Sequence, residues 1–585
     1  MTISLRTNDE IVAQLRSLGV ERGELVALAL ARGVGLGVAA RGVQYAIASL
    51  DPASTIAAVE ETIGPRWCWW SGETAARLTD SGVRVARCWD VAAVHRLLFG
   101  GLSADPARIW AALHDLDLRS LPSMGQLDLL ASSYLDRGGD GDREEAVRPD
   151  GHLRPEWVDG GWRRTPQRLG GWAGTAERAA TLQVALLEQL QVTGDALGTA
   201  RSESAAELLC AELTADGLPI EVAEAERIIA SFIGPRPADE RVAAEIRRRR
   251  DDLVLDHAIG RNVDLRNPAQ VKAMLERLGV DVPDTRAHRL ERMLDAHPII
   301  EPLLAWRKAE RIATTYGYGW LDENVGPDGR LRGGWSATDG AAGRMTAQAG
   351  LHNLPSEMRP AVAAAPGWRL VRADLGQIEP RVLAAVSADP ALAAATQADD
   401  LYAPVAARLG VERPVAKIAV LAAMYGQTSG TAGQALEGLE RAYPVAMQYL
   451  RAAEESGRAG VDVRTHGGRC VGMWQVPDHS DVAHERAVRA ARGRFARNAV
   501  VQGAAAEFFK AWAVTVRARL ADRDAEIVLC LHDELLVHAR AEEATEVAIV
   551  VEHCLAEAAS RWVPSGSVRF VADASIIARW SDAKP

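Results

Sequence analysis

The chain carries a candidate catalytic carboxylate, Asp374, at the end of a predicted strand. The segment WRLVRADLGQIEPRVLAAVS (368–387) opens with residues 368–373, whose apolar character is typical of a buried strand, and Asp374 follows directly. Carboxylates are well placed to meet ligands where strands end in loops. The alternative is that Asp374 caps a helix that starts near residues 376–379.

Two further acids, Asp533 and Glu534, follow His532 between apolar runs. The segment AEIVLCLHDELLVHAR (525–540) has the pattern of a hairpin with these acids at its turn. Adjacent carboxylates between apolar strands need a positive partner, and a divalent cation is a natural one. The alternative is a plain exposed turn made of polar residues.

A helix predicted within VERPVAKIAVLAAMYGQTSG (411–430) carries a graded surface. Arg413, Lys417, Leu421 and Tyr425 are spaced four apart, so they share one helix face. The two cations suit a polyphosphate, and the apolar and aromatic side chains suit a sugar and a base. A solvated basic edge is the alternative, but only five residues of the chain are lysines, which favours the functional interpretation.

Together these three segments predict metal-assisted nucleotidyl transfer. If Asp374 and Asp533 end neighbouring strands, they can hold two Mg²⁺ ions about 3.5–4 Å apart, and Mn²⁺ is expected to substitute. One ion would activate an attacking hydroxyl, and the other would support the leaving pyrophosphate. The face with Arg413 and Lys417 would bind the triphosphate.

Composition limits the class of protein. The 585 residues are 48% hydrophobic and 25% charged, which excludes disordered and fibrous chains. A net charge of −11 argues against a protein that coats nucleic acid by bulk charge, and the six cysteines form no C-x-x-C pair. Because the chain start lacks an apolar core and no uncharged apolar run nears 18 residues, we expect a soluble cytoplasmic protein, associated with the bacterial nucleoid and not with a membrane.

The first 190 residues are predicted to have an α/β pattern. Short apolar runs bounded by glycine predict strands at 24–30, 33–40 and 42–49. Periodic stretches predict helices at 90–98 and 107–116. Residues 136–171, rich in Gly, Asp, Arg and Pro, predict a long loop.

Helical periodicity dominates the next part of the chain, at 173–215, 245–252 and 267–279. A mixed α+β pattern follows, so we expect a multidomain protein. The arginine run at 247–250 either contacts duplex phosphates or forms a solvated face paired with Asp251 and Asp252.

From about residue 200 to the end, the chain resembles a family A DNA polymerase, the DNA polymerase I type. The segments ADLGQIEPRVLA, RPVAKIAVLAAMYG and LHDE are similar in order and spacing to that family's motifs A, B and C. Two further stretches agree, GRMTAQAGLHNLP (343–355) and RFARNAVVQGAAAEFF (494–509). The resemblance implies a right-hand fold of palm, fingers and thumb.

The resemblance also implies a role for each matching residue. For the metals and the chemistry it implies Asp374, Asp533, the backbone carbonyl of Leu375, the auxiliary acid Glu534, and Lys417. For the incoming nucleotide it implies Arg413, Lys417, Leu421, Tyr425, Gln377, His532 and Glu379, the acid that rejects ribonucleotides. For primer and template it implies Arg344, Asn353, Arg494, Asn498 and Gln502.

Several positions depart from the family pattern. Leu421 stands where the family has Phe or Tyr, and Leu375 and Gly376 replace its Tyr-Ser. Pro380 replaces Leu, and Ala422 replaces Gly. None of these changes removes a ligand or a charged contact, so we expect an active polymerase with altered nucleotide selection or speed.

We expect residues 1–190 to form a ribonuclease H-like, 3′–5′ exonuclease-type domain and residues 191–585 to form the polymerase domain. Within the latter we expect the thumb at about 200–300, the palm at about 301–390 and 505–585, and the fingers at about 391–504.

The exonuclease-like domain is predicted to be inactive, and a 5′ nuclease domain to be absent. No Asp-x-Glu pair lies on a strand before Asp51, and Glu177 is at most a single remnant, so two metals could not be held there. The tryptophans of this part are expected in its core, with base stacking as the alternative; they are Trp67, Trp69, Trp70 and Trp89.

The sequence therefore predicts a DNA-templated DNA polymerase that acts as a monomer on primer–template DNA with deoxynucleoside triphosphates. We expect no proofreading and a setting in DNA repair or gap filling. Two rivals stay open: a catalytically silent, polymerase-like DNA-binding protein, and a polymerase whose exonuclease domain works with unusual ligands.

Overall fold

The computed structural model describes residues 2–122, 145–426, 432–476, 482–531, 533–563 and 566–583. The chain forms two compact units. The first comprises Met1–Ala215, Trp335–Thr346 and Val371–Ile576, and the second comprises Asp216–Gly334, Ala347–Leu370 and Ile577–Pro585.

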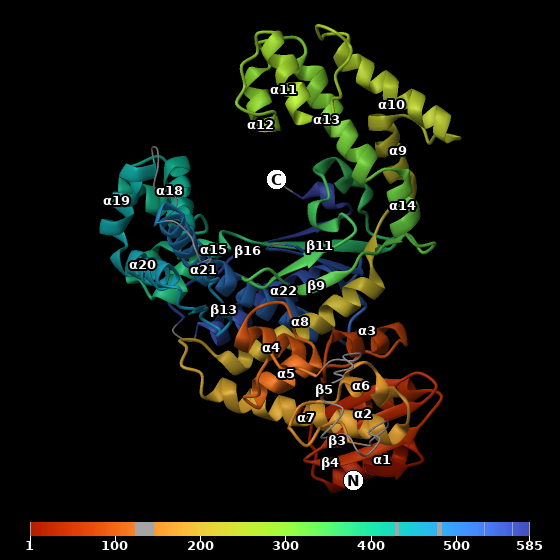
Figure 1. The fold of residues 1–585 in the computed structure, drawn as a ribbon. Helices are drawn as coiled ribbons and strands as arrows, with labels where there is room; N and C mark the ends of the chain where they lie inside the picture. The colour runs from red at the N-terminus through yellow and green to blue at the C-terminus, as the bar shows by residue number, and fades with distance from the viewer. Residues whose placement is uncertain are drawn as a thin grey trace, which may run out of the picture. The chain divides into compact units, whose positions relative to one another are not determined.

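A six-stranded sheet forms the amino-terminal part of the first unit (Figure 1). Its strand order is β1 (Thr2–Leu5), β4 (Val43–Ala48), β3 (Gly35–Ala40), β2 (Leu25–Ala31), β5 (Arg66–Trp69) and β6 (Cys88–Asp90). β2, β3 and β4 form an antiparallel meander, whereas β2, β5 and β6 run parallel, as do β1 and β4. The three strands predicted in this part are confirmed.

Helices cover this sheet: α1 (Asn8–Ser17), α2 (Pro52–Thr62), α3 (Gly72–Asp80), α4 (Val91–Phe99), α5 (Pro106–Leu113), α6 (Pro155–Val158) and α7 (Pro166–Glu188). The helices predicted at 90–98 and 107–116 correspond to α4 and α5. Trp67, Trp69 and Trp89 are at most 1% exposed and Trp70 is 7% exposed, so the prediction that they belong to the core is confirmed.

Residues 136–144 of the loop predicted at 136–171 lie outside the described residues. The later part of this prediction is wrong, because α6 lies within it and α7 begins at Pro166 after the N-cap Thr165. The glycines there serve close packing. A Cβ on Gly170 would lie 2.5 Å from Thr2 Cγ2, and one on Gly37 of β3 would lie 2.0 Å from the carbonyl carbon of Leu169. The helix therefore rests directly on the sheet, and glycine marks a helix–strand contact.

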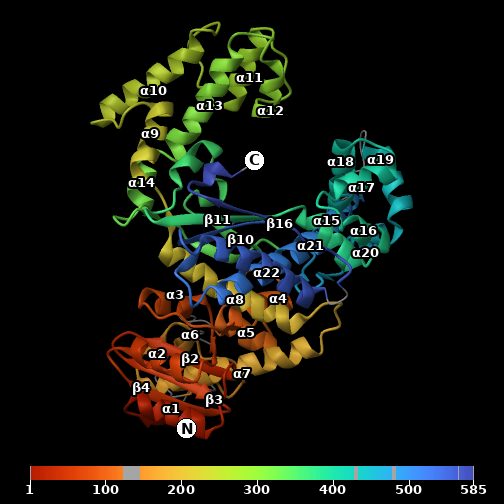
Figure 2. The same ribbon diagram turned by 180° about the vertical axis from the view of Figure 1, so that it is seen from behind.

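A four-stranded sheet occupies the middle of the first unit, in the order β14 (Ala525–Leu531), β15 (Glu534–Arg540), β11 (Trp368–Leu375) and β16 (Ala572–Ile577). β14 and β15 form the predicted antiparallel hairpin. The neighbouring helices are α8 (Ala196–Asp216), α21 (Val482–Arg519) and α22 (Ala544–Trp562), and a second hairpin consists of β9 (Trp335–Asp339) and β10 (Arg344–Ala347) (Figure 2).

A helical subdomain follows β11. It contains α15 (Ile378–Ser387), α16 (Pro390–Ala395), α17 (Tyr402–Leu409), α18 (Arg413–Tyr425), α19 (Ala432–Ala442) and α20 (Pro444–Ala459), with the short hairpin β12 (Val463–Arg464) and β13 (Cys470–Val471). α20 packs along α21, and α15 packs across it.

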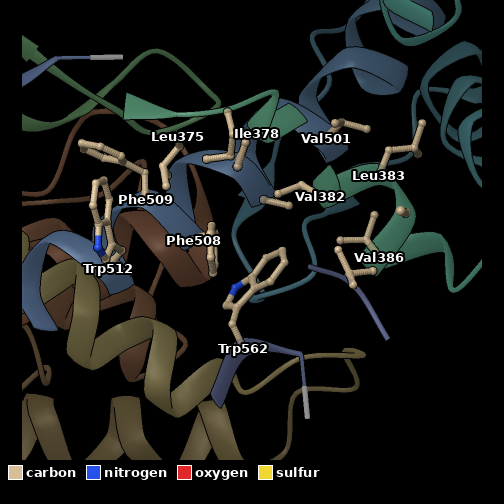
Figure 3. Close-up of a cluster of buried hydrophobic side chains, with 14 of the residues drawn as sticks. Leu375, Ile378, Val382, Leu383, Val386, Val501, Phe508, Phe509, Trp512 and Trp562 are labelled. Atoms are coloured by element: carbon tan, nitrogen blue, oxygen red, sulfur yellow. The ribbon is translucent and has the colours of Figure 1, made fainter. Parts of the chain in front are cut away.

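One apolar cluster joins the sheet to these helices (Figure 3). Leu375 at the end of β11 is 2% exposed, and Phe508, Phe509 and Trp512 of α21 are at most 3% exposed. Burial of such side chains stabilises each by roughly 1.5–3 kcal/mol. The cluster therefore fixes the end of β11, where Asp374 lies.

The second unit is mainly helical. It contains β7 (Leu218–Pro219), α9 (Val222–Ile233), α10 (Glu240–Leu255), α11 (Pro268–Arg277), α12 (Ala287–Leu290), α13 (Ile300–Thr315), α14 (Tyr318–Asn324) and β8 (Arg330–Leu331). In the described part of the chain, none of the helices combines the length and hydropathy that a membrane span requires.

The arginine run lies on α10, where residues 247–249 are exposed, as expected of a solvated face. The pairing with Asp251 and Asp252 that was part of this alternative is wrong. Arg250 pairs with Glu310 of α13 at 2.6 Å, while Asp251 and Asp252 pair with arginines from the following loop. The loop brings competing guanidinium groups to α10, which the sequence pattern alone did not reveal.

Candidate functional site

The ends of β11 and β15 bring the two predicted aspartates together. The backbone N–H of Leu375 donates to the carbonyl oxygen of Asp533 at 2.9 Å, so Asp374 and Asp533 belong to adjoining chain segments. Gln377, not Asp374, is the N-cap of α15. The interpretation of Asp374 as a helix cap is therefore wrong.

Arg372 supplies a positive partner that the sequence analysis missed. Its Nε donates to Glu534 Oε1 at 2.6 Å, and its Nη2 donates to Asp374 Oδ2 at 2.9 Å. Glu534 is buried within this contact, so the turn is not a plain exposed one. The contact between Arg372 and Asp374 had a signal in the sequence, because residues two apart lie on the same face of a strand.

The carboxylate cluster is crowded with negative charge. The pKa of Asp374 is raised to about 6, first by burial and then by the nearby Asp533, with smaller contributions from Glu534 and Asp573 and against the opposing effect of Arg372. Burial also raises the pKa of Asp533. Both shifts mean that the ionised forms lack enough positive charge nearby.

The donor set fits a hard divalent cation. Asp374 and Asp533 offer carboxylate oxygens, and Leu375 adds a backbone carbonyl, which is the oxygen chemistry that Mg²⁺ and Mn²⁺ prefer. Within the described ranges, no three or more His, Cys, Asp or Glu side chains already form a metal-binding group. The pair and the carbonyl would have to be completed by substrate or water oxygens.

The predicted face of α18 is present. Arg413, at its first turn, donates to Asp400 Oδ2 at 2.5 Å, a partner that the sequence did not reveal. Lys417 is exposed and has no partner among the residues that the structure describes. Tyr425 ends the helix, and its hydroxyl donates to Glu379 Oε2 at 3.0 Å.

Glu379 is held from two sides. Besides Tyr425, Arg344 of β10 donates from Nη2 to Glu379 Oε1 at 2.6 Å. Glu379 and Arg344 line a cavity of about 190 Å³, together with Asp533, Leu421 and Gln377. One cavity thus contains a carboxylate of the sheet, the acid of α15 and the apolar residue of α18.

Gln377 stabilises the entrance to α15. Its φ of 55° lies in the left-handed region, which costs a non-glycine residue free energy. Its side chain accepts from Leu401 N at 2.8 Å and donates to Asp400 Oδ1 at 3.0 Å. Gln377 and Arg413 therefore share Asp400, which links α15 to α18.

Arg494, Asn498 and Gln502 lie along one face of α21, as the spacing predicted. No side-chain hydrogen bond is formed by any of the three within the described structure, although Arg494 packs over Gly426 at the end of α18. Two other arginines of α21 form hydrogen bonds within the protein: Arg492 donates to Trp474 and Arg458 carbonyls, and Arg497 donates to Ala423 O and Glu454. The open face therefore borders α18.

His532 lies outside the described residues. Asn353 belongs to the second unit, where its carbonyl accepts from Tyr316 Oη and Arg311 Nη2, both at 2.7 Å.

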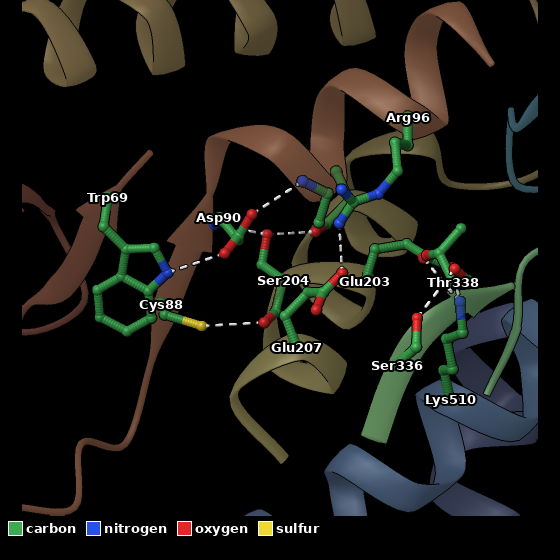
Figure 4. A network of polar contacts seen from close by, with 12 residues as sticks. Trp69, Cys88, Asp90, Arg96, Glu203, Ser204, Glu207, Ser336, Thr338 and Lys510 are labelled. Carbon is green, nitrogen blue, oxygen red and sulfur yellow. Dashed lines mark hydrogen bonds and ion pairs between the residues drawn. The ribbon is translucent and has the colours of Figure 1, made fainter. Parts of the chain in front are cut away.

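The amino-terminal sheet uses its carboxylates differently. Asp90, at the end of β6, is fully buried and accepts from Trp69 Nε1 at 3.0 Å and Ala93 N at 2.8 Å (Figure 4). Glu177 accepts from the backbone of Gly42 at 3.0 Å. The strand β2 carries no acid at all.

A comparison with known sequence families decides the classification. The profile of DNA polymerase family A matches residues 239–582. The chain belongs to DNA polymerase family A. The matched residues include both aspartates, α18 and the open face of α21.

Individual relatives agree with the family. DNA polymerase I of Chloroflexus aurantiacus is 33% identical over 293 residues, which are 45% of this chain and 30% of that protein. The thermostable DNA polymerase I of Thermus thermophilus is 32% identical over 309 residues, 48% of this chain and 36% of that protein. The match thus spans about a third of the length of these relatives.

The fold of this family A chain is similar to that of the POL domain of Pol1 from M. smegmatis, solved in complex with DNA primer–template and dNTP. The TM-score is 0.65, the sequence identity is 21%, and the match covers 99% of each chain. The likeness of fold therefore includes the amino-terminal sheet.

Proposed function

We propose that the chain is a DNA-templated DNA polymerase that extends a primer 3′-OH with deoxynucleotides. One observation carries the proposal: the cavity that joins Asp533, Glu379 and Leu421 lies between the carboxylate cluster and the face of α18. Family membership and the primer–template and dNTP bound to the similar M. smegmatis domain support it.

In the proposed mechanism, Asp374, Asp533 and the carbonyl of Leu375 would hold two divalent ions, Mg²⁺ or Mn²⁺. When bound, such ions would supply charge stabilisation for the attacking 3′-oxygen and the leaving pyrophosphate. Lys417 and Arg413 bind the triphosphate, and Arg413 exchanges its contact with Asp400 for the phosphates.

Glu379, fixed by Arg344 and Tyr425, fills the space beside the sugar 2′ carbon. Arg494, Asn498 and Gln502 contact the nucleic acid, and Arg372 holds the cluster together before the ions bind.

Primer extension tests this function. The full chain, a labelled primer–template, Mg²⁺ and four dNTPs should give extension that Asp533→Asn abolishes. The absence of extension with either Mg²⁺ or Mn²⁺, together with tight DNA binding, would instead support the silent DNA-binding protein.

We also propose that residues 1–190 are a ribonuclease H-like exonuclease-type domain without catalytic activity, in an enzyme of repair or gap filling. The mixed sheet, with its antiparallel meander and parallel strands, supports the domain type. The lack of acids on β2 and the use of Asp90 in packing support inactivity. Incubation with labelled single-stranded DNA and Mg²⁺ should leave it intact, and shortening from the 3′ end would contradict this proposal.

A further inference from the structure

A second cavity of the first unit shares no lining residue with the cavity at the carboxylates. Its volume is about 660 Å³, within the range of small-molecule sites, roughly 300–1,000 Å³. Its wall is formed by residues that precede or begin β2, β5 and β6, together with residues of α8, α21 and α22. Since β2, β5 and β6 are parallel, it lies at the edge of the sheet opposite to Asp90.

Seven arginines and only three acidic residues line this cavity. Three of the arginines pair with acids: Arg517 binds Glu212 through two contacts of 2.6 Å, and Arg519 and Arg561 share the single carboxylate of Glu557. Of the acids, Glu507 has its pKa raised to about 7 by burial, so much of its charge is lost at neutral pH.

The other four arginines, Arg22, Arg66, Arg87 and Arg201, form no ion pair with any described residue. Arg66 Nη1 donates only to the carbonyl of Cys88 at 3.3 Å, and Arg87 Nη1 is buried without a hydrogen-bond partner. Burial, then the nearby guanidinium of Arg201, lowers the pKa of Arg66, with a further contribution from Arg87. Like charges converge here without a direct ion pair, and guanidinium groups bind phosphate through paired N–H donors.

The rest of the wall is suited to a less polar group. Ala511, Val514 and Ala558 line it beside Trp562, whose indole Nε1 is buried without a hydrogen-bond partner. An apolar surface next to a guanidinium cluster matches a ligand that combines phosphates with a base and a sugar.

We infer that this cavity binds the phosphate groups of a small molecule, either a nucleoside phosphate or inorganic pyrophosphate, at a site separate from the proposed polymerase centre. The chemistry of both candidates is the same at Arg66, Arg87 and Arg201. The two candidates differ in whether the apolar part of the cavity wall contributes to binding, because only a nucleoside phosphate has a base and a sugar to contact it.

Titration calorimetry on the full chain, without DNA and with EDTA in place of divalent metal, tests the inference. The probes are deoxyadenosine 5′-diphosphate, pyrophosphate and a short single-stranded oligonucleotide. One equivalent of diphosphate or pyrophosphate should bind. Arg201→Gln, which changes an exposed side chain, should weaken binding at least about tenfold, as expected for one charge-assisted hydrogen bond. Arg66→Gln should do the same if its melting temperature stays near that of the parent chain.

Two control variants locate the site. Arg32→Gln makes the same substitution at an exposed arginine between β2 and β3, and Lys417→Ala removes the proposed triphosphate contact of α18; both should leave the Kd unchanged. Tighter binding of the nucleotide than of pyrophosphate would assign the apolar wall to the base and sugar, and equal binding would assign the site to inorganic phosphate. The inference is overturned if Arg201→Gln and Arg66→Gln bind like the parent chain, if Lys417→Ala abolishes binding, or if only the oligonucleotide binds.

Discussion

Asp90 and Asp374 occupy the same kind of position in two sheets of the first unit, yet their surroundings differ. Each is at the carboxyl end of a strand, β6 or β11. Asp90 is 0% exposed and accepts from an indole and a backbone N–H. Asp374 is 35% exposed at its side chain and faces other acids, with Arg372 as its cation.

The difference concerns what remains available to a ligand. The acceptors of Asp90 are already used by Trp69 and by the first turn of α4, so it stabilises packing. The cluster around Asp374 has more negative charge than Arg372 offsets, so a cation would lower its free energy. A strand-end carboxylate indicates a metal site only when its oxygens remain accessible to a ligand, as those of Asp374 do and those of Asp90 do not.

The largest expected effect separates the two aspartates by activity. Asp374→Asn removes a proposed metal ligand whose contribution is several kcal/mol, so primer extension should fall roughly a thousandfold or more. Asp90→Asn should keep extension near the parent rate when rates are normalised to folded protein. Equal losses in both variants would contradict the comparison.

The second effect separates them by pH. The pKa of Asp90 is raised from 3.8 to about 7, first by burial and then by Glu207. Folded protein therefore holds a proton that unfolded protein has released, so the free energy of unfolding should fall as pH rises from about 4 to 7, by a few kcal/mol, and then level off.

Asp90→Asn should flatten this part of the pH profile in urea unfolding at several pH values. Asp105→Asn, at the exposed N-cap of α5, is the matched control and should retain the parent slope. A slope unchanged by Asp90→Asn would show that other groups, such as Glu507, account for the dependence.

Lysine gives the next comparison, at smaller magnitude. Lys417 has no partner among the described residues, whereas Lys272 pairs with Glu276 on α11 at 3.5 Å. Lys417→Ala should lower kcat/KM for dNTP roughly ten- to a hundredfold, because it removes a charge-assisted contact to phosphate. Lys272→Ala should leave steady-state extension kinetics unchanged. A comparable loss in that variant would show that the net charge of the protein, and not a specific contact between Lys417 and the triphosphate, determines kcat/KM.

The sequence predicted the carboxylates, the face of α18 and the strands that carry them, because these depend on local periodicity. It did not predict the cations and acids that complete them. Arg372 and Glu534 are 162 residues apart, and their contact depends on β11 lying beside β15. The link from Arg413 to Asp400 likewise depends on how α17 and α18 pack.

The arginine cavity was hidden for a different reason. Its arginines come from separate segments of a chain in which nearly every basic residue is arginine. Because arginine is common throughout the chain, its frequency in these segments did not mark them as special. Only the tertiary structure brings the guanidinium groups together.

The smallest effect concerns Tyr425, whose hydroxyl contacts Glu379, the acid that the proposal assigns to the exclusion of ribonucleotides. Glu379→Ala removes the carboxylate and should raise ribonucleotide incorporation strongly. Tyr425→Phe removes only the 3.0 Å hydrogen bond and leaves the contact with Arg344, so discrimination should fall by at most about tenfold, the value of one hydrogen bond of 0.5–1.5 kcal/mol. Competition between dATP and ATP in single-nucleotide extension measures the ratio. Tyr318→Phe, which loses a similar 2.9 Å bond to Gly234 O in the second unit, should keep the parent ratio. If Tyr425→Phe incorporated ribonucleotides as readily as Glu379→Ala, Arg344 alone would be unable to hold Glu379 in place. The hydrogen bond from the Tyr425 hydroxyl would then be essential to the exclusion of ribonucleotides.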